Sequence, residues 1–217
     1  MDKTFLIIQP HSDDAILSCC SFILSSDDNI EVLGIENNPK RIKEDINLFK
    51  FIGVKFQHLN LDFIDNCYSG FYKLIGTNGA MEHDVVMAYL TEYFTLEVIN
   101  KIKSNLIEFL FSNKDKYEYI LPLGIGHPFH YFIFDIVKDL SYVKYFYREF
   151  PHSFKRRTKN QFDAAIKGMR LFYSNDDVEL HDLKFKIAQK FYKSQSGFFF
   201  YEQGNIKKYY KEEIYVR

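Results

Sequence analysis

Short apolar runs alternate with segments of helical periodicity in the first part of the chain, and this rhythm is the strongest constraint that the sequence places on the fold. The run at 4–9 lacks the two-residue alternation of a half-exposed strand, so it is expected to be buried on both faces. The expected elements follow one another as strand 4–9, helix 13–26, strand 30–36, helix 40–52 and strand 54–61. Such alternation is typical of a parallel sheet whose strands are joined by right-handed helical crossovers.

The same rhythm resumes after residues 62–83, a segment with three glycines and no periodicity, where we expect a long loop. Loops of that length in compact domains are commonly functional or mobile. The later expected elements are one long helix or a broken pair over 84–113, a strand at 117–125, a helix after it, a strand at 143–150 and a helix near 179–194, followed by an irregular, charged C-terminal end. Without repeats or linkers, we expect a single domain, 1–217, of the α/β class: a Rossmann-like, mostly parallel sheet flanked by helices on both faces.

The composition restricts the partners and the compartment. The formal net charge is -1, whereas proteins that bind nucleic acids or anionic membranes usually carry a basic surplus, so neither partner is expected. No segment has the roughly 20 apolar residues that cross a bilayer, and the start of the chain lacks the apolar core of a secretory signal. The 3 cysteines have no metal-binding spacing and leave an odd number for disulfides, which fits a reducing compartment. We expect a soluble cytoplasmic protein, with monomer and homo-oligomer both left open.

Histidines and aspartates directly follow two of the expected strands. "QPHSDD" places His11, Asp13 and Asp14 after the first strand, and "GIGHPFHYF" places His127 and His130 after the fourth. In open parallel sheets, ligands bind in the crevice beyond the carboxyl ends of the strands. Both groups of side chains are therefore expected to point into the same crevice.

Two imidazoles and one carboxylate, from His11, His130 and Asp14, form a ligand set that suits zinc with one position open for water. Zinc lowers the pKa of bound water from about 15.7 toward roughly 7, so hydroxide becomes available at neutral pH. Asp13 is expected to take the proton of that water as a general base. His127, one turn before His130, is expected to protonate a leaving group or to stabilise an oxyanion.

These motifs also have simpler interpretations. Adjacent aspartates at a helix start are commonly caps, and two histidines at this spacing are more often capping or surface residues than ligands. The same ligand set serves mononuclear non-haem iron, but the oxygenases of that type are built on all-β double sheets, so hydrolysis is the better interpretation and Fe2+ is the alternative metal. The other histidines lack such neighbours and are expected to be structural or surface residues, with His83 close enough to the long loop to approach a substrate: His58, His83, His152 and His181.

The motifs resemble those of the LmbE-like, PIG-L type N-acetylglucosaminyl deacetylases. That family carries (P/A)-H-x-D-D after a strand and H-x-x-H after a later strand, matched here by "PHSDDA" and "HPFH". The resemblance implies the same three zinc ligands, with Asp13 as the base and His127 at the oxyanion or leaving group. "RIKE" is similar to the family's R-x-x-E at the second helix, which implies that Arg41 contacts the sugar. "FYREFP" and "KIAQKFYKSQ" are similar to the family's last strand and closing helix.

Two departures from the family pattern bear on sugar recognition. Ala15 replaces the usual glutamate, and "ENNPK" replaces a Thr-Gly type turn. The expected function is zinc-dependent removal of an N-acetyl group from an N-acetylglucosamine-type amino sugar or its conjugate. The alternatives are a catalytically silent metal-binding or sugar-binding relative, and an amidase acting on a non-sugar acyl amine. Aromatic residues at 68–72 and 198–201 could stack on sugar rings, although core or rim packing is the commoner role of such residues.

Overall fold

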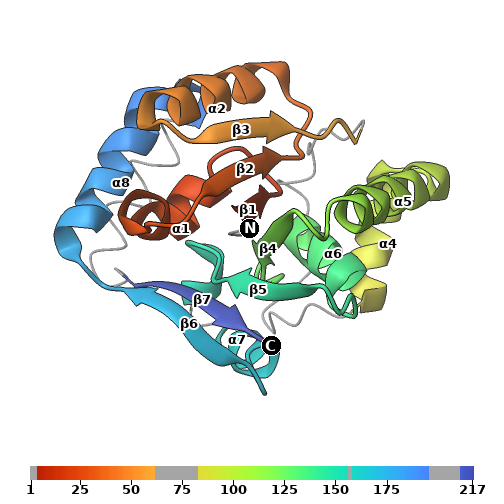
Figure 1. Cartoon of the computed structure of the whole chain (residues 1–217). Helices are drawn as coiled ribbons and strands as arrows, with labels where there is room; N and C mark the ends of the chain where they lie inside the picture. Colours follow the sequence, from red (N-terminus) through yellow and green to blue (C-terminus); the bar gives the residue numbers. More distant parts are fainter. Residues whose placement is uncertain (1–3, 62–82, 156–157, 196–210) are drawn as a thin grey trace.

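The computed structural model describes residues 4–61, 83–155, 158–195 and 211–217, and the strands in these ranges form one seven-stranded sheet (Figure 1). The strands are β1 (Thr4–Gln9), β2 (Ile30–Gly34), β3 (Lys55–His58), β4 (Tyr117–Pro122), β5 (Val143–Tyr147), β6 (Arg170–Asn175) and β7 (Glu212–Val216). The α-helices are α1 (Asp14–Ser25), α2 (Pro39–Ile52), α4 (His83–Tyr93), α5 (Leu96–Ser112), α6 (Pro128–Val137), α7 (Lys159–Ala165) and α8 (Val178–Phe191), and two 3-10 turns are η2 (His152–Phe154) and η4 (Lys193–Gln195). The predicted α/β class is confirmed.

The sheet is parallel over its first five strands. The strand order is β3-β2-β1-β4-β5-β7-β6, and β1 is the middle one of the five parallel strands, with β2 on one side and β4 on the other. The five predicted strands are all present, but four of them end two to three residues earlier than the apolar pattern indicates, at Gly34, His58, Pro122 and Tyr147. The residues just beyond these ends form the loops at the carboxyl edge of the sheet.

The C-terminal part of the chain departs from the prediction. β7 pairs antiparallel with β5, and β6 pairs antiparallel with β7. The expectation of an irregular, charged C-terminal end is therefore wrong for Glu212–Val216, whereas 196–210 lie outside the described residues. β7 was hidden in the sequence because it begins with Glu212 and Glu213, whose side chains are nonetheless buried and paired with Lys184 and Arg148.

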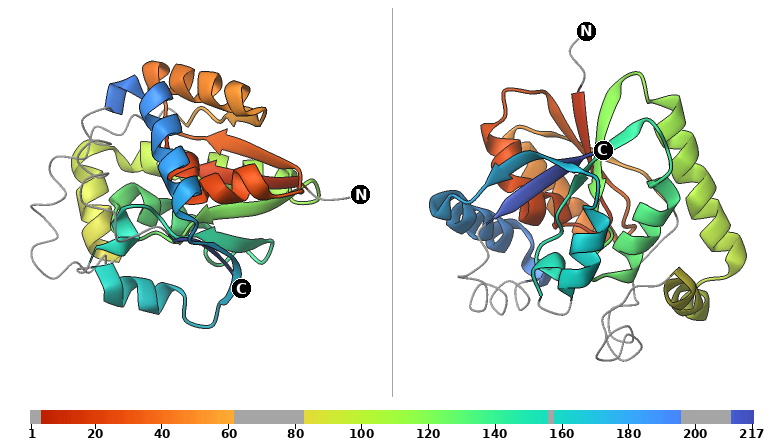
Figure 2. Two further views of the ribbon diagram at one scale, coloured as in Figure 1. Left: turned by 90° about the vertical axis from the view of Figure 1, so that its left-hand side faces the viewer. Right: turned by 90° about the horizontal axis from the view of Figure 1, so that it is seen from below.

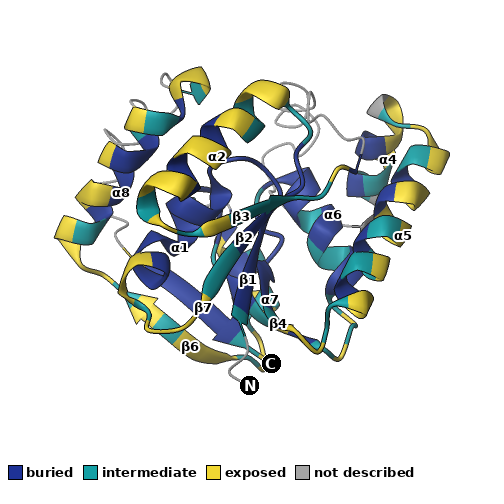
Figure 3. Cartoon of the chain, turned by 45° about the horizontal axis from the view of Figure 1, so that its top comes forward, coloured by how far each residue is buried: buried dark blue, intermediate teal, exposed yellow. Residues whose placement is uncertain are grey.

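Helices cover both faces of the sheet, and each face has its own apolar core. Because successive strand residues point to opposite faces, Leu6 and Ile8 pack with the helices α4, α5 and α6, whereas Phe5 and Ile7 pack with α1, α2 and α8. The view from below places these two groups of helices on opposite sides of the strands (Figure 2). The central strands are buried, and the outward faces of the helices are exposed (Figure 3).

The segment predicted as one long helix or a broken pair is a pair. α4 ends at Tyr93 and α5 begins at Leu96, where the Thr95 hydroxyl caps α5 by accepting the N–H of Val98 at 3.3 Å. A side-chain oxygen at the N-cap satisfies a backbone donor that has no partner within the helix. The predicted loop at 62–83 lies outside the described residues, apart from its last position, which starts α4.

Gly124 and Gly126 shape the loop between β4 and α6. Both have positive φ, and a Cβ added at Gly124 would lie 2.7 Å from Cβ of Phe134 on α6. Gly168 also has positive φ, but a Cβ added there would meet nothing within 4 Å. The loop therefore needs glycine at position 124 for two reasons, backbone conformation and close approach of α6.

This difference leads to a prediction with a matched control. Gly168→Ala should lower the free energy of unfolding by about 1–2 kcal/mol, the strain of a left-handed alanine. Gly124→Ala should lower it by a further 1–3 kcal/mol or so, because its methyl group also overpacks against Phe134. Urea unfolding of both variants checks this, and equal losses would show that the packing of α6 on the loop is not tight.

Candidate metal centre

The loops after β1 and β4 meet because these two strands are neighbours. β1 and β4 run parallel, with Ile7 opposite Ile120, so their carboxyl ends lie at the same edge of the sheet. The chain after β1 carries His11, and the chain after β4 carries His130. The Nδ1 atom of His11 lies 2.9 Å from Nε2 of His130, across 119 positions of sequence. The structure therefore brings the "PHSDD" and "HPFH" motifs together, as expected.

Asp14 completes a compact group of three donor atoms. Its Oδ2 atom lies 3.3 Å from Nδ1 of His11 and 3.1 Å from Nε2 of His130. Ligand atoms around one tetrahedral ion with bonds of about 2.0–2.2 Å are separated by roughly the same distances. If both rings donated to Asp14, two N–H groups would face each other across 2.9 Å, whereas one cation accommodates all three donor atoms. The residues present therefore fit a divalent metal.

The surroundings of Asp14 favour its ionised form. Its carboxylate also accepts the backbone N–H of His11 at 2.7 Å. Burial acts to raise the pKa of Asp14, but the charges and hydrogen bonds of His130 and His11 outweigh it and hold the pKa well below its usual range. An ionised carboxylate between two imidazoles is the protonation state that a metal ligand needs.

The Asp13 carboxylate lies close enough to Asp14 and His11 to interact with them electrostatically, but it is not one of the three donor atoms. Asp13 has φ of 97° and ψ of -23°, a left-handed conformation that is uncommon outside glycine. Its side chain makes no capping hydrogen bond to α1, so the simpler interpretation of "DD" as helix caps does not apply to it. Instead Oδ2 of Asp13 lies 3.6 Å from Nη2 of Arg41. Burial raises the pKa of Asp13 well above its usual value, against the opposing effect of Arg41.

His127 lies beside the three donor atoms and forms the N-cap of α6. Its Nδ1 accepts the backbone N–H of Phe129 at 3.3 Å, and an Nδ1 that accepts carries no proton, so the neutral ring is protonated at Nε2. Its ring centroid is 4.5 Å from that of His11 and 5.0 Å from that of His130. Burial, and then the neighbouring imidazoles, lower the pKa of His127 well below its usual value. The ring is a buried neutral donor.

His127 could replace Asp14 as the third donor beside His11 and His130. One donor atom each from His11, His127 and His130 lies within 4.8 Å of the others, so three imidazoles could also face one ion. The set with Asp14 is more compact, with no separation above 3.3 Å. The capping hydrogen bond of His127 also places its proton on Nε2, which then has no lone pair for a metal. We therefore favour His11, Asp14 and His130 as the ligands.

Arg41 stabilises the loop that follows β1. Nη1 donates to Oε1 of Glu36 at 2.9 Å, and Nη2 donates to the carbonyl of Ser12 at 2.8 Å. Its place in the first turn of α2 is set by Asn38, whose side chain caps that helix by accepting from the N–H of Arg41 at 3.4 Å. The "ENNPK" turn therefore provides a helix cap. Contact between Arg41 and a sugar stays a prediction.

The residues after α8 are connected to the loop that follows β1 through a buried carboxylate, Asp45, which the sequence analysis did not identify. Asp45 of α2 accepts from the hydroxyl of Ser12 at 2.7 Å, the amide of Gln9 at 2.9 Å and the hydroxyl of Tyr192 at 2.6 Å. Burial raises the pKa of Asp45 to about 7, against these hydrogen bonds. The side chain of Gln195 extends the contact by donating to the carbonyl of Ser12 at 3.3 Å. β1, α2 and the chain after α8 are thus joined around the loop that carries two of the candidate ligands, His11 and Asp14.

The end of β5 contributes two further residues that sequence reasoning missed. Glu149 is fully buried, and its Oε1 accepts the backbone N–H groups of Gly124 and Ile125. His152, expected to be structural or surface, is buried beside the cluster, with its ring 5.4 Å from His127 and 5.5 Å from His130. Ligands bind beyond the carboxyl ends of parallel strands, and Glu149 and His152 both follow the carboxyl end of β5. Their position after a predicted strand was therefore the signal that could have identified them from the sequence.

The remaining histidines lie elsewhere. Nε2 of His58 lies 3.0 Å from the carbonyl of Glu36. His181, on α8, packs against Phe150 and Phe185, with ring centroids 6.0 Å and 5.0 Å away. His83 starts α4, and its side chain is not described. The aromatic residues at 68–72 and 198–201 also lie outside the described residues.

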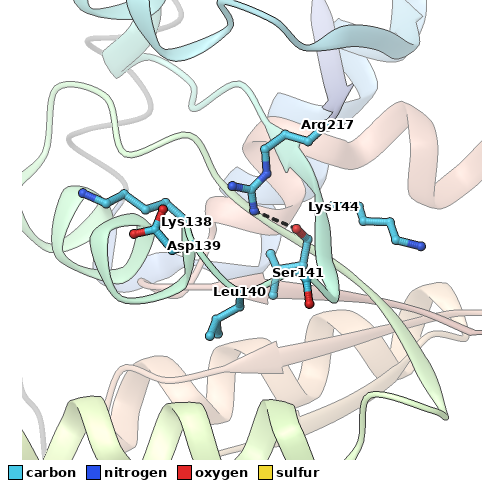
Figure 4. Close-up of a pocket in the computed structure, with 7 residues that line it drawn as sticks. Lys138, Asp139, Leu140, Ser141, Lys144 and Arg217 are labelled. Atoms are coloured by element: carbon cyan, nitrogen blue, oxygen red, sulfur yellow. Dashed lines mark hydrogen bonds between the residues drawn. The ribbon is translucent and has the colours of Figure 1, made fainter.

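A surface cavity of about 400 Å³ lies away from this group, where α6 leads into the amino end of β5 (Figure 4). Its lining includes Lys138, Lys144 and Arg217, and Nη2 of Arg217 donates to the carbonyl of Val143 at 2.7 Å. The histidines lie beyond the opposite, carboxyl ends of the strands. This cavity is therefore not part of the candidate centre.

Among the described helices, none combines the length and the apolar character that crossing a bilayer requires. No family model, curated protein or solved structure matches the chain. The function is therefore inferred from the chemistry of the residues that meet at the carboxyl ends of β1, β4 and β5.

Proposed function

We propose that the protein is a zinc-dependent hydrolase of the LmbE-like, PIG-L type, which removes the acetyl group from an N-acetylglucosamine-type amino sugar or its conjugate. One observation carries the proposal: donor atoms of His11, Asp14 and His130 come together within 3.3 Å, and a buried carboxylate, Asp13, stands beside them without capping α1. A site that only bound a metal would not need that second buried acid.

His11, Asp14 and His130 would hold the ion, through Nδ1, Oδ2 and Nε2 respectively. A bound zinc ion supplies a lowered pKa for a coordinated water and polarises the amide carbonyl. The same donor set also accepts Fe2+, so the metal is a proposal as well.

Asp13 is the proposed site of proton transfer, and His127 is the proposed hydrogen-bond donor. Asp13 takes a proton from the attacking water, whose oxygen forms a bond to the carbonyl carbon while the C=O bonding pair moves onto the carbonyl oxygen. The same proton then passes to the amide nitrogen as the carbon–nitrogen bond breaks and the C=O bond forms again. The products are the amine and acetic acid, which loses its remaining proton to become acetate. The Nε2–H of His127 donates to the carbonyl oxygen as negative charge develops on it. Arg41 holds Asp13 and the Ser12 carbonyl in place and is the candidate contact to the sugar.

The proposal is tested with protein purified without chelators. The zinc and iron content is measured, and N-acetylglucosamine conjugates with thiol-precursor, lipid and nucleotide groups are screened for release of free amine, with non-sugar N-acetyl amines alongside. We expect about one metal ion per chain and amine release from at least one sugar conjugate. His130→Ala should lose both, whereas His181→Ala, which removes a histidine remote from the cluster, should keep both.

The two alternatives give different results in the same assay. An amidase on non-sugar substrates would release amine only from the compounds without sugar. A catalytically silent relative would bind metal but release amine from none of them. Metal retained by His130→Ala at the wild-type level would contradict the proposed ligand set.

A further inference from the structure

We infer that Glu149 is a positioning residue for the metal centre: its carboxylate fixes the loop that presents His127, and it lies behind the ring of the proposed ligand His130. The inference rests on the proposed function, because it takes His130 as a metal ligand. It concerns a residue to which neither the sequence motifs nor the resemblance gives a role.

The first observation is the placement of the Glu149 carboxylate relative to the His130 ring. Nε2 of His130 faces His11 and Asp14, so Nδ1 is the ring atom on the far side. Oε1 of Glu149 lies 3.9 Å from that Nδ1, within reach of an ion pair but longer than a hydrogen bond, and both side chains are fully buried. Metal-binding histidines usually direct their second nitrogen to a carboxylate or carbonyl, which fixes the tautomer and increases the basicity of the ligand atom.

The second observation is that the same oxygen holds the loop before His127. Oε1 of Glu149 accepts the N–H of Gly124, and it accepts the N–H of Ile125 at 2.8 Å. These two residues follow β4 and lead directly into the N-cap of α6. One carboxylate thus touches the backbone that places His127 and faces the ring of His130.

The third observation is electrostatic. A neutral glutamine could accept both backbone N–H groups without the large desolvation penalty of a buried charge. Among the neighbours that the structure gives to the Glu149 carboxylate, His130 is the one that can carry or share positive charge. A divalent ion held by one carboxylate, Asp14, keeps one positive charge, and Asp13 already faces Arg41. Burial raises the pKa of Glu149 to about 8, and the remaining positive charge of a bound ion, acting through the imidazole, would favour the ionised carboxylate.

The backbone of Glu149 is also held firmly, as positioning requires. Its carbonyl accepts the N–H of Ser153 at 3.0 Å and the hydroxyl of Ser153 at 2.6 Å. The next residue, Phe150, donates its N–H to the hydroxyl of Ser18 on α1 at 3.1 Å. The carboxylate therefore approaches the ring from a fixed segment rather than from a free loop.

The test measures zinc affinity with a competing chromophoric chelator, using the full chain and Zn2+ alone. Glu149→Gln keeps the size of the side chain and an acceptor for the loop but removes the charge. We expect its affinity for zinc to fall about 10- to 100-fold, the usual effect of losing such a partner. The matched control is Glu213→Gln, which removes another buried carboxylate, paired with Arg148 next to Glu149, and should bind zinc as wild type does.

The outcomes separate this inference from the proposed function. If wild type binds zinc, His130→Ala does not, and Glu149→Gln binds as tightly as wild type, the role of Glu149 is refuted while the metal centre stands. If wild type itself binds no zinc, the proposed function fails, and this inference fails with it. An equal loss of affinity in Glu213→Gln would also count against Glu149, because the effect would then be a general loss of stability.

A second measurement needs no variant and covers the case in which Glu149→Gln does not fold. In zinc-loaded wild-type protein with 15N-labelled histidine, NMR should show His130 with its proton on Nδ1, in slow exchange with water. A His130 ring protonated at Nε2, or an Nδ1 proton in fast exchange, would overturn the inference.

Discussion

Asp13→Asn is expected to lower turnover of the N-acetyl amino-sugar conjugate by about 10²- to 10⁴-fold, the usual contribution of a general base, while zinc stays bound. The amide cannot take a proton from water, but it does not change the three donor atoms of His11, Asp14 and His130. Asparagine also tolerates the left-handed backbone that Asp13 adopts, so the loop should keep its conformation. kcat and the metal content of the same preparation are the measurements.

Asp163 provides a control for the loss of a carboxylate, and two outcomes would contradict the role of Asp13. Asp163→Asn removes a carboxylate from an exposed surface pair with Lys159 on α7 and should leave kcat unchanged. A protein that only bound metal or sugar would give no turnover in wild type and no difference in Asp13→Asn. Turnover that survived Asp13→Asn would assign the base to another residue.

Lys184→Met is expected to lower the free energy of unfolding by about 3–5 kcal/mol, because it leaves a buried charge without its partner. Nζ of Lys184 on α8 donates to Oε1 of Glu212 on β7 at 3.0 Å, and both side chains are almost completely shielded from water. The other oxygen of Glu212 accepts from the N–H of Ser21 on α1 at 2.8 Å and from the Ser21 hydroxyl. The pair therefore joins three elements on one face of the sheet.

Two further variants show whether the unpaired charge is the cause. Adding Glu212→Gln to Lys184→Met should recover much of the lost stability, because no buried charge then stays unpaired. Lys159→Met, which breaks the exposed pair with Asp163, should unfold close to wild type. Urea denaturation measures all of them, and a Lys184→Met protein as stable as wild type would refute the importance of the pair.

The parallel half of the fold could be predicted because it depends on local patterns. Apolar runs mark β1 to β5, and one topological rule places the residues after β1 and β4 at the same edge of the sheet. His11, Asp14 and His130 could be predicted in this way because they follow strand ends closely, by two, five and eight positions after Gln9 or Pro122. The adjacency of β1 and β4, which brings them together across more than a hundred positions, was not predicted and comes from the structure.

The other parts depend on tertiary contacts that no local pattern reveals. Glu212 looks like a surface residue until Lys184 is placed beside it, so β7 could not be recognised from polarity. Glu149 needs β5 to lie next to β4 before its carboxylate meets the loop at Gly124. Asp45 likewise needs the end of α8 to be docked, because Tyr192 lies 147 positions away in sequence.

The antiparallel end of the sheet makes the attachment of β6 depend on β7. Within the described residues β6 pairs with β7 and stands at the edge of the sheet, so β7 is its link to the parallel strands. The pairing of β7 with β5 brings Tyr147 against Ile214, a contact of high sequence separation whose closure costs conformational entropy. We expect that a chain whose β7 has not paired exposes the edge of β5, the kind of surface to which chaperones and other partly folded chains bind.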